Sequence, residues 1–289
     1  MRILESELIL NADGSVYHLN LKPEHVAHTI ITVGDPDRVA TVTNYFDTIE
    51  FSTRKREFCT QTGTYKGKRI TVISTGIGTD NIDIVFNELD ALVNIDFETR
   101  MIKEEFTQLN FFRIGTSGGI QEHISIDSFL ASAEAIGFDN LIHFYEDSSH
   151  WDQDLTDAFV SHMSWNPKNS EPYCVSASDA LLSLFPKGEF LHGITGTNVG
   201  FYGPQGRKLR LGLQDGAMND KLQAFNHNGK QITNLEMETS AIYGLAKLMG
   251  HQAVSLNVIL ANRANGTFSQ DPKEAVNRLI QKVLDSIVA

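Results

Sequence analysis

Runs of apolar, β-branched residues that stop abruptly at glycine are the feature that most constrains this 289-residue chain. The first run, Thr29–Val33, reads TIITV and is followed by the turn sequence Gly-Asp-Pro. Val39, Val42 and Phe46 then recur at helical spacing. A strand followed directly by a helix, repeated along a chain, indicates an α/β fold. We therefore expect a central, twisted, mixed β-sheet flanked by helices, built as a single domain over residues 1–289.

Further strand and helix patterns alternate along the chain. Apolar spacing typical of an amphipathic helix is clearest over 81–93, and residues 66–68 fit the turn of a hairpin. The other expected strands cover 62–65, 69–74, 111–114, 128–133, 190–195 and 253–260, and the other expected helices cover 155–163, 241–249 and 273–287. Ligands bind at the carboxyl ends of strands in such sheets, so glycines at strand ends mark candidate site positions. These glycines are Gly34, Gly76, Gly115 and Gly196.

The charge balance limits the partners of this chain. Lys and Arg total 24 against 36 Asp and Glu, which gives a formal net charge of −12. Nucleic acids and anionic membranes select basic surfaces, so neither is an expected partner. Cys59 and Cys174 are the only cysteines in a long chain, which indicates a reducing compartment. The N-terminus lacks a signal-peptide pattern and no apolar run suits a membrane span, so the expected location is cytoplasmic.

Three arginines indicate an anion site: Arg38 in GDPDRV, Arg56 in KREF and Arg113 in RIGTSGG. Glycines let backbone N–H groups approach a ligand, and guanidinium groups donate paired hydrogen bonds to phosphate. Gly34 beside a helix N-terminus would add further donors. For GDPDRV alone, an equally good interpretation is that the aspartates only cap a helix and Arg38 is solvated.

Two later segments suit a nucleoside. FYGPQGR, residues 201–207, offers an aromatic face, an amide and a fourth arginine for a planar base. EMET, residues 236–239, offers two carboxylates, and a carboxylate can accept hydrogen bonds from the vicinal hydroxyls of ribose. We expect Glu236 and Glu238 to point to different sides of the turn, so that one reaches the ligand. The alternative is that both acids only stabilise a helix N-terminus.

Other site types find no support in the sequence. The ten histidines show no metal-ligand spacing, so no metal site is expected. RIGTSGG lacks the Gly-Lys-Ser/Thr ending of a Walker loop, and neither it nor STGIG has the GxGxxG spacing of a dinucleotide site. A tight turn between a strand and a helix remains an alternative for both segments.

Together and in this order, the segments resemble the nucleoside phosphorylase family with the purine/uridine phosphorylase fold, and within it the uridine phosphorylases. The likeness runs from about His18 to Arg263. It implies a homo-oligomer, a dimer or a hexamer built from dimers, in which neighbouring subunits complete each other's sites. It also implies that the substrates are a nucleoside and inorganic phosphate and that no cofactor is needed.

The resemblance implies a role for each matching residue. At the phosphate it places Gly34, Arg38, Arg56, Arg113 and Thr116. At the ribose it places His18, Thr116, Glu236, Met237 and Glu238. At the base it places Phe201, Gln205 and Arg207. The implied catalytic residues are Arg38, Arg113 and Arg207, and the residues implied to enter a neighbouring subunit's site are His18 and Arg56.

Three departures from the family pattern affect this interpretation. Bacterial relatives with a monovalent-cation site use the glutamate after the KREF arginine, here Glu57, and a serine where this chain has Asn81, which argues against the cation. The stretch 94–110 is longer than in compact bacterial enzymes, so the size of the oligomer stays open. The purine-specific branch has an aspartate after the late strand, whereas this chain has Asn262 and Arg263, which favours a pyrimidine.

The resulting hypothesis is reversible phosphorolysis of uridine to uracil and ribose 1-phosphate in pyrimidine salvage, with deoxyuridine and thymidine as further candidate substrates. Catalysis would come from alignment of the reactants and stabilisation of charge, without a protein nucleophile. The alternatives are a purine nucleoside phosphorylase or a nucleosidase on the same scaffold, and a catalytically silent nucleoside-binding protein. Residues 193–206 are the expected mobile lid.

Overall fold

A computed structural model describes residues 2–146 and 149–289. The strands are β1 (Thr29–Val33), β2 (Thr48–Lys55), β3 (Phe58–Tyr65), β4 (Lys68–Ser74), β5 (Ile95–Asp96), β6 (Met101–Ile102), β7 (Asn110–Gly119), β8 (Phe129–Gly137), β9 (Tyr173–Ser176), β10 (Leu191–Thr197), β11 (Asn226–His227), β12 (Lys230–Glu236), β13 (Gln252–Asn262) and β14 (Thr267–Phe268). The α-helices are α1 (Pro36–Thr43), α2 (Thr79–Asn94), α3 (Gln153–Met163), α4 (Asp179–Leu182), α5 (Met218–Ala224), α6 (Thr239–Leu248) and α7 (Pro272–Val288). Three short 3-10 helices are η1 (Pro23–His25), η2 (Leu141–Phe144) and η3 (Gly203–Gln205).

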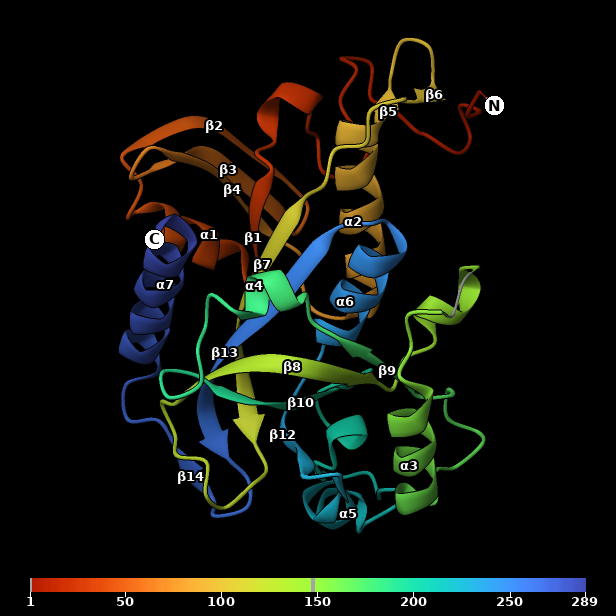
Figure 1. Cartoon of the computed structure of the whole chain (residues 1–289), viewed down its shortest axis with the longest axis vertical. Coiled ribbons are helices and arrows are strands. Elements are labelled where there is room, and N and C mark those ends of the chain that lie inside the picture. Colours follow the sequence, from red (N-terminus) through yellow and green to blue (C-terminus); the bar gives the residue numbers. More distant parts are fainter. Residues whose placement is uncertain (1, 147–148) are drawn as a thin grey trace.

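A twelve-stranded mixed sheet runs through the molecule, with helices on both of its faces (Figure 1). Its order is β11-β12-β10-β8-β13-β7-β1-β4-β3-β2, with β9 paired to β8 and β14 paired to β13. The expected α/β fold with a mixed sheet is confirmed. Helices α2, α3, α6 and α7 begin and end within two residues of the expected bounds. The strands that were not expected from the sequence are β2, β5, β6, β9, β11, β12 and β14.

One part of the sheet closes into a ring of five strands. β12 pairs in parallel with β10 and in antiparallel with β7, so the strands β12, β10, β8, β13 and β7 form a closed ring. The pairing of β12 with β7 that closes the ring is limited to a few residues: Asn234 lies opposite Gly119, and Leu235 opposite Gly118. Glu236, the next residue of β12, therefore lies beside β7.

Two segments that were expected to be glycine-rich loops are partly strand. β7 runs through Gly119, so the strand expected over 111–114 continues through RIGTSGG, and the alternative of a tight turn is wrong for this segment. β10 contains Gly193, so the first part of the expected lid 193–206 belongs to the sheet. A Cβ atom on Gly193 would lie 2.2 Å from Cγ2 of Thr233, which shows that this glycine serves close packing of adjacent strands.

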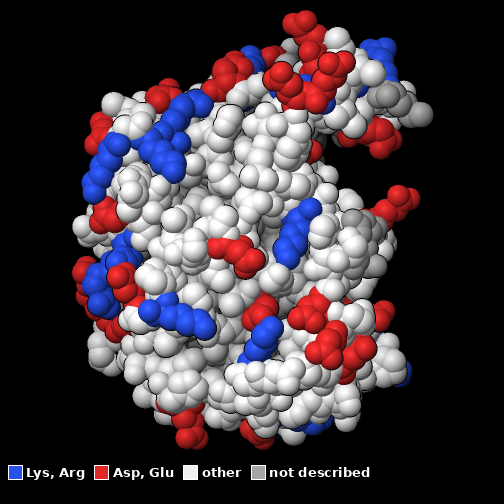
Figure 2. All heavy atoms as spheres, in the orientation of Figure 1, with Lys and Arg blue, Asp and Glu red and all other residues white. Residues whose placement is uncertain are grey.

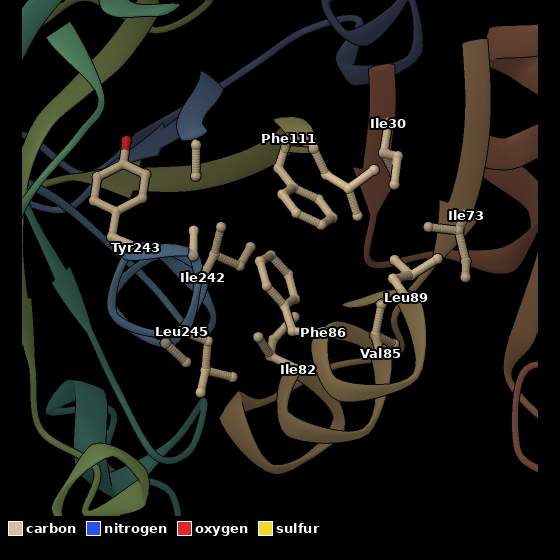
Figure 3. Packing of buried hydrophobic residues seen from close by; sticks show 14 of the residues in the cluster. Ile30, Ile73, Ile82, Val85, Phe86, Leu89, Phe111, Ile242, Tyr243 and Leu245 are labelled. Atoms are coloured by element: carbon tan, nitrogen blue, oxygen red, sulfur yellow. The ribbon is translucent and has the colours of Figure 1, made fainter. Parts of the chain in front are cut away.

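Apolar layers hold the helices on the sheet: two large ones lie on its two faces, and a third packs α3 and α5 against it. On one face, Phe86 of α2 stacks on Phe111 of β7 with ring centroids 4.2 Å apart, and Ile242 and Leu245 of α6 lie beside them (Figure 3). The opposite face carries α1 and α7 over a second apolar cluster. The helical spacing of apolar residues in α2 explains this packing, because it places one continuous apolar stripe against the sheet.

The charged side chains lie outside these layers. On the face in Figure 2, Lys and Arg side chains are scattered among Asp and Glu. Within the described residues, no helix has the length and apolar character to cross a membrane.

The stacked pair Phe86–Phe111 gives a stability prediction. Replacing Phe86 by Ala leaves a cavity between α2 and β7, so the free energy of unfolding should fall by about 3–5 kcal/mol. The control is Ile102→Ala, because Ile102 is 71% exposed and its loss should change stability by less than about 0.5 kcal/mol. Chemical denaturation measures both. Equal, small effects of the two substitutions would contradict the packing described here.

Candidate active site

A cavity of about 620 Å³ opens at the ring closure. Ten of the residues expected from the sequence line it: Gly34, Arg38, Arg113, Thr116, Phe201, Gln205, Arg207, Glu236, Met237 and Glu238. These residues come from β7, the start of α1, the loop around η3 and the β12–α6 junction. Segments far apart in the sequence therefore converge on one cavity.

Arg113 is buried in this cavity and is shared by two carboxylates. Its Nη2 atom lies 2.5 Å from Oε2 of Glu238 and 3.1 Å from Oε2 of Glu236. Its Nη1 atom donates to Oδ1 of Asn257 at 3.0 Å. The two carboxylates thus meet at one guanidinium group, and the expectation that they point to different sides of the turn is wrong.

Gly115 makes the position of Arg113 possible. Residues 113 and 115 lie on the same face of β7, and the Arg113 side chain folds back over the glycine. A Cβ atom on Gly115 would lie 1.8 Å from Nη1 of Arg113 and 2.8 Å from Oδ1 of Asn257. The glycine was expected to mark a turn, but it provides space inside a strand.

Glu236 anchors the start of α6. Its carboxylate accepts hydrogen bonds from the backbone N–H groups of Glu238 and Thr239, and from the hydroxyl of Thr197 at 2.7 Å. Backbone N–H groups at a helix start have no partner within the helix, and a carboxylate there satisfies them. The alternative of a helix-capping acid is therefore correct for Glu236, in addition to its contact with Arg113.

Glu238 is also buried, and it too lines the cavity. Oε1 accepts a hydrogen bond from the backbone N–H of Gly78 at 2.9 Å, while Oε2 contacts Arg113. Burial raises the pKa of Glu238 above its usual range, and the opposing effect of Arg113 is smaller. This carboxyl group is held in place from two sides while it remains part of the cavity wall.

Arg38 lines the same cavity as Arg113, but it has no carboxylate partner among the residues described. Its Nη1 atom reaches only the carbonyl oxygen of Ile114, at 3.5 Å. Burial lowers the pKa of the Arg38 guanidinium, and Arg113 lowers it further. A partly desolvated positive charge next to a second cation would be stabilised by an anion. Gly34 and Thr116 line the same part of the cavity.

Another part of the cavity wall is formed by the loop around η3. The guanidinium carbon of Arg207 lies 3.7 Å from the centre of the Phe201 ring. Nη1 of Arg207 donates to the Phe201 carbonyl oxygen at 2.6 Å and to Oε1 of Gln205. The Gln205 side chain is buried, and the backbone carbonyl oxygen of Gln205 accepts a hydrogen bond from Nη1 of Arg263. The expected base-binding residues therefore form one bonded group.

His18 and Arg56 do not line the cavity of their own chain. They lie near each other at a different place: the Arg56 guanidinium carbon is 5.9 Å from the centre of the Tyr17 ring, which packs edge-on against the His18 ring at 4.8 Å. Both side chains are at least partly exposed. The resemblance implied that they serve a neighbouring subunit, and that role stays a prediction.

Sequence reasoning missed two residues that shape the site. Asn257 holds Arg113, and the backbone of Gly78 holds Glu238. A signal for Asn257 was present, because it is, with Ser255, one of two polar residues in the mainly apolar run 253–260. For metals, a search of residues 2–146 and 149–289 finds no group of three or more His, Cys, Asp or Glu side chains that could hold an ion.

Comparison with known proteins decides the family. Residues 28–289 match the model of the phosphorylase superfamily. The chain belongs to this superfamily. The resemblance stated from the short segments is thereby confirmed at the level of the family.

Individual relatives cover almost the whole chain. A crystal structure of a Trypanosoma brucei nucleoside phosphorylase, described as showing uridine phosphorylase activity, superposes with a TM-score of 0.85 at 31% identity, over 97% of this chain and 99% of that one. A uridine phosphorylase of Thermococcus kodakarensis is 28% identical over 93% of this chain and 85% of its own length. A DeoD-type purine nucleoside phosphorylase of Clostridium perfringens is 26% identical over 94% of this chain and 98% of its own.

Adding a methyl group at Gly115 tests the geometry around Arg113. Gly115→Ala forces Arg113 away from Asn257, so the free energy of unfolding should fall by about 1–3 kcal/mol. Gly118→Ala is the matched control in the same strand, because the nearest atom to its Cβ would be 3.8 Å away. Thermal and chemical denaturation compare the two variants. If both are equally stable, Arg113 does not lie over Gly115.

Proposed function

We propose that this phosphorylase acts on uridine and phosphate, giving uracil and ribose 1-phosphate reversibly. The observation that carries the proposal is a cavity lined by two chemically different groups of residues, which we call its cationic end and its base end. The cationic end has Arg38, which forms no ion pair with a carboxylate in residues 2–146 and 149–289, and the base end has the amide and guanidinium groups of Gln205 and Arg207. The Glu238 carboxylate, which is paired with Arg113, lines the same cavity. Phosphate, base and ribose hydroxyls match these three parts in chemistry.

At the cationic end, Arg38 would hold the phosphate together with Gly34 and Thr116. Arg113 is neutralised by Glu236 and Glu238, so its role would be to orient Glu238 and to approach the phosphate with its remaining donor capacity. No protein nucleophile is needed, because the phosphate oxygen attacks C1′ as the bond to the base breaks. Alignment of the two reactants supplies much of the rate increase.

At the sugar, Glu238 would accept hydrogen bonds from the ribose hydroxyls next to Met237. His18 and Arg56 would complete this site from a neighbouring subunit, with His18 at the 5′-hydroxyl and Arg56 at the phosphate. This assignment requires a homo-oligomer. It explains why two charged or polar residues of the expected set lie together but away from the cavity of their own chain.

At the base, Gln205 and Arg207 would bind the polar edge of uracil and stabilise its negative charge as it leaves. Phe201 would pack against the ring. A purine would require an acid to protonate it, and the position of that acid is occupied by Asn262, the last residue of β13. Its amide nitrogen donates to the carbonyl oxygens of Gln121 and Ile124, so it is fixed in the protein.

The comparisons support a nucleoside phosphorylase more strongly than a particular base. Relatives named as uridine phosphorylases and as purine nucleoside phosphorylases have similar identity to this chain. The Trypanosoma brucei relative, described as showing uridine phosphorylase activity, favours uridine. The Gln205–Arg207 group favours it independently, because uracil has two carbonyl oxygens that accept from such donors.

An assay of base release tests the proposal. The purified protein is incubated with uridine, inosine or adenosine, with and without phosphate, and the free base is measured. We expect uracil release that depends on phosphate and much slower release of either purine. Release without phosphate would instead identify a nucleosidase, faster purine release a purine phosphorylase, and no release a nucleoside-binding protein.

Arg207 is tested by substitution. Arg207→Ala removes a donor from the leaving base, so kcat/KM for uridine should fall by about 10²–10³-fold. Arg210→Ala is the control, since Arg210 is exposed in the same loop and does not line the cavity. Steady-state kinetics with saturating phosphate compare them. Near wild-type activity of Arg207→Ala would refute the assignment of the base end.

A further inference from the structure

A carboxylate of α2 holds the segment that carries His18. Glu88 accepts a hydrogen bond from the backbone N–H of His18 at 2.9 Å through Oε1, and from that of Leu19 at 2.8 Å through Oε2. Oε1 also lies 2.6 Å from Nδ1 of the His18 ring. The Glu88 side chain is only 15% exposed, so water competes little for these contacts.

This arrangement determines which ring nitrogen of His18 carries the proton. A carboxylate can only accept hydrogen bonds, so Nδ1 must be the donor. In a neutral imidazole the other nitrogen, Nε2, is then an acceptor. Within residues 2–146 and 149–289, Nε2 forms no hydrogen bond, and the side chain is 27% exposed.

We propose that Glu88 is a positioning residue for phosphorolysis. It fixes the Nδ1–H tautomer of His18 and presents Nε2 as an acceptor for the 5′-hydroxyl of a nucleoside bound to a neighbouring subunit. The inference rests on the proposed function, which places His18 at that hydroxyl. It adds a residue on a helix outside the cavity, acting through His18.

The same segment is also held from its other side. Nζ of Lys55 donates to the carbonyl oxygen of Tyr17 and to Oδ1 of Asn11, and it lies 4.8 Å from the centre of the Tyr17 ring. Arg56, the next residue, lies over the same ring. The backbone of 17–19 is thus anchored independently of the Glu88 charge. A substitution at Glu88 should therefore change which nitrogen of the His18 ring carries the proton, while residues 17–19 stay in place.

Glutamine is the informative substitution, because it keeps the shape of Glu88 but has only one acceptor atom. If its oxygen takes the place of Oε2, it can accept from the backbone N–H of Leu19 and from that of His18, which lies 3.1 Å from Oε2, and its NH₂ group faces Nδ1 of His18. Nδ1 must then become an acceptor, and the proton moves to Nε2. The reversed orientation would place the NH₂ group against the N–H of Leu19. Glu88→Gln therefore favours the wrong tautomer for accepting from the 5′-hydroxyl.

The kinetic test compares uridine with 5′-deoxyuridine, which lacks the hydroxyl. Wild type, His18→Ala, Glu88→Gln and the double variant are measured with saturating phosphate. Glu88→Gln should lower kcat/KM for uridine about 3- to 10-fold and leave kcat/KM for 5′-deoxyuridine nearly unchanged. The double variant should be no worse than His18→Ala. Glu122→Gln, the same change at an exposed residue, is the control and should have no effect.

Each result has a definite meaning. Equal losses on both nucleosides would overturn the proposal, since Glu88 would then be merely structural, and unchanged uridine kinetics would overturn it too. A wild-type protein that releases no uracil in the presence of phosphate would refute the proposed function itself. An active wild type with additive effects of the two substitutions would leave the function intact and refute only the coupling of Glu88 to His18.

The tautomer can be observed without any variant of Glu88. Nitrogen-15 NMR at about pH 8, where an imidazole is ordinarily neutral, distinguishes protonated from unprotonated ring nitrogens. The signals of His18 are assigned by their loss in His18→Ala. We expect a protonated Nδ1 and an unprotonated Nε2 in the wild type, and the reverse in Glu88→Gln. A wild-type proton on Nε2 would overturn the proposal even if Glu88→Gln fails to fold.

Discussion

The buried contact of Arg113 with Glu236 and Glu238 is the interaction on which the site depends. Two carboxylates and one guanidinium removed from water are costly unless each is hydrogen-bonded. Here the excess negative charge is met by backbone N–H groups of Gly78, Glu238 and Thr239, and by the N-terminus of α6. The contact can exist only because the ring of strands closes at β7 and β12. The pairing of β12 with β7 that closes the ring therefore also brings the residues of the site together.

This contact also determines the electrostatics of the cavity. Arg113 is paired with the two carboxylates, whereas the neighbouring Arg38 has no carboxylate partner among the described residues and is available to an anion. A protein with a net charge of −12 can thus hold a local positive site. The long-range field of such a protein would repel phosphate, so binding must come from short-range hydrogen bonds inside the cavity.

The sequence predicted what depends on local pattern and missed what depends on pairing between distant segments. The apolar spacing in α2 and the apolar run in β1 were sufficient to predict these elements. Each pattern depends only on which neighbouring residues of the same segment are buried. β12 was missed, since its short pairing with β7 joins residues more than a hundred positions apart. Gly115 was misread for the same reason: a turn and a strand glycine look alike until the side chain that needs the space is known. The segments RIGTSGG, FYGPQGR and EMET still identified the cavity, because its lining depends on residue chemistry more than on the elements that carry it.

At the base end, the existing bonds of the loop bear on how a base could be discriminated. Arg207 donates to Oε1 of Gln205, which fixes the orientation of the amide. That oxygen has a second lone pair, so it can still accept from the N3–H of uracil while the NH₂ group donates to a carbonyl oxygen. Cytosine has no N3–H and presents an amino group in place of one carbonyl, so the fixed amide would face the wrong groups. Selectivity would then arise because Arg207 prevents the amide from turning over, and the unpaired donors left by a wrong base would cost more than a correct base gains.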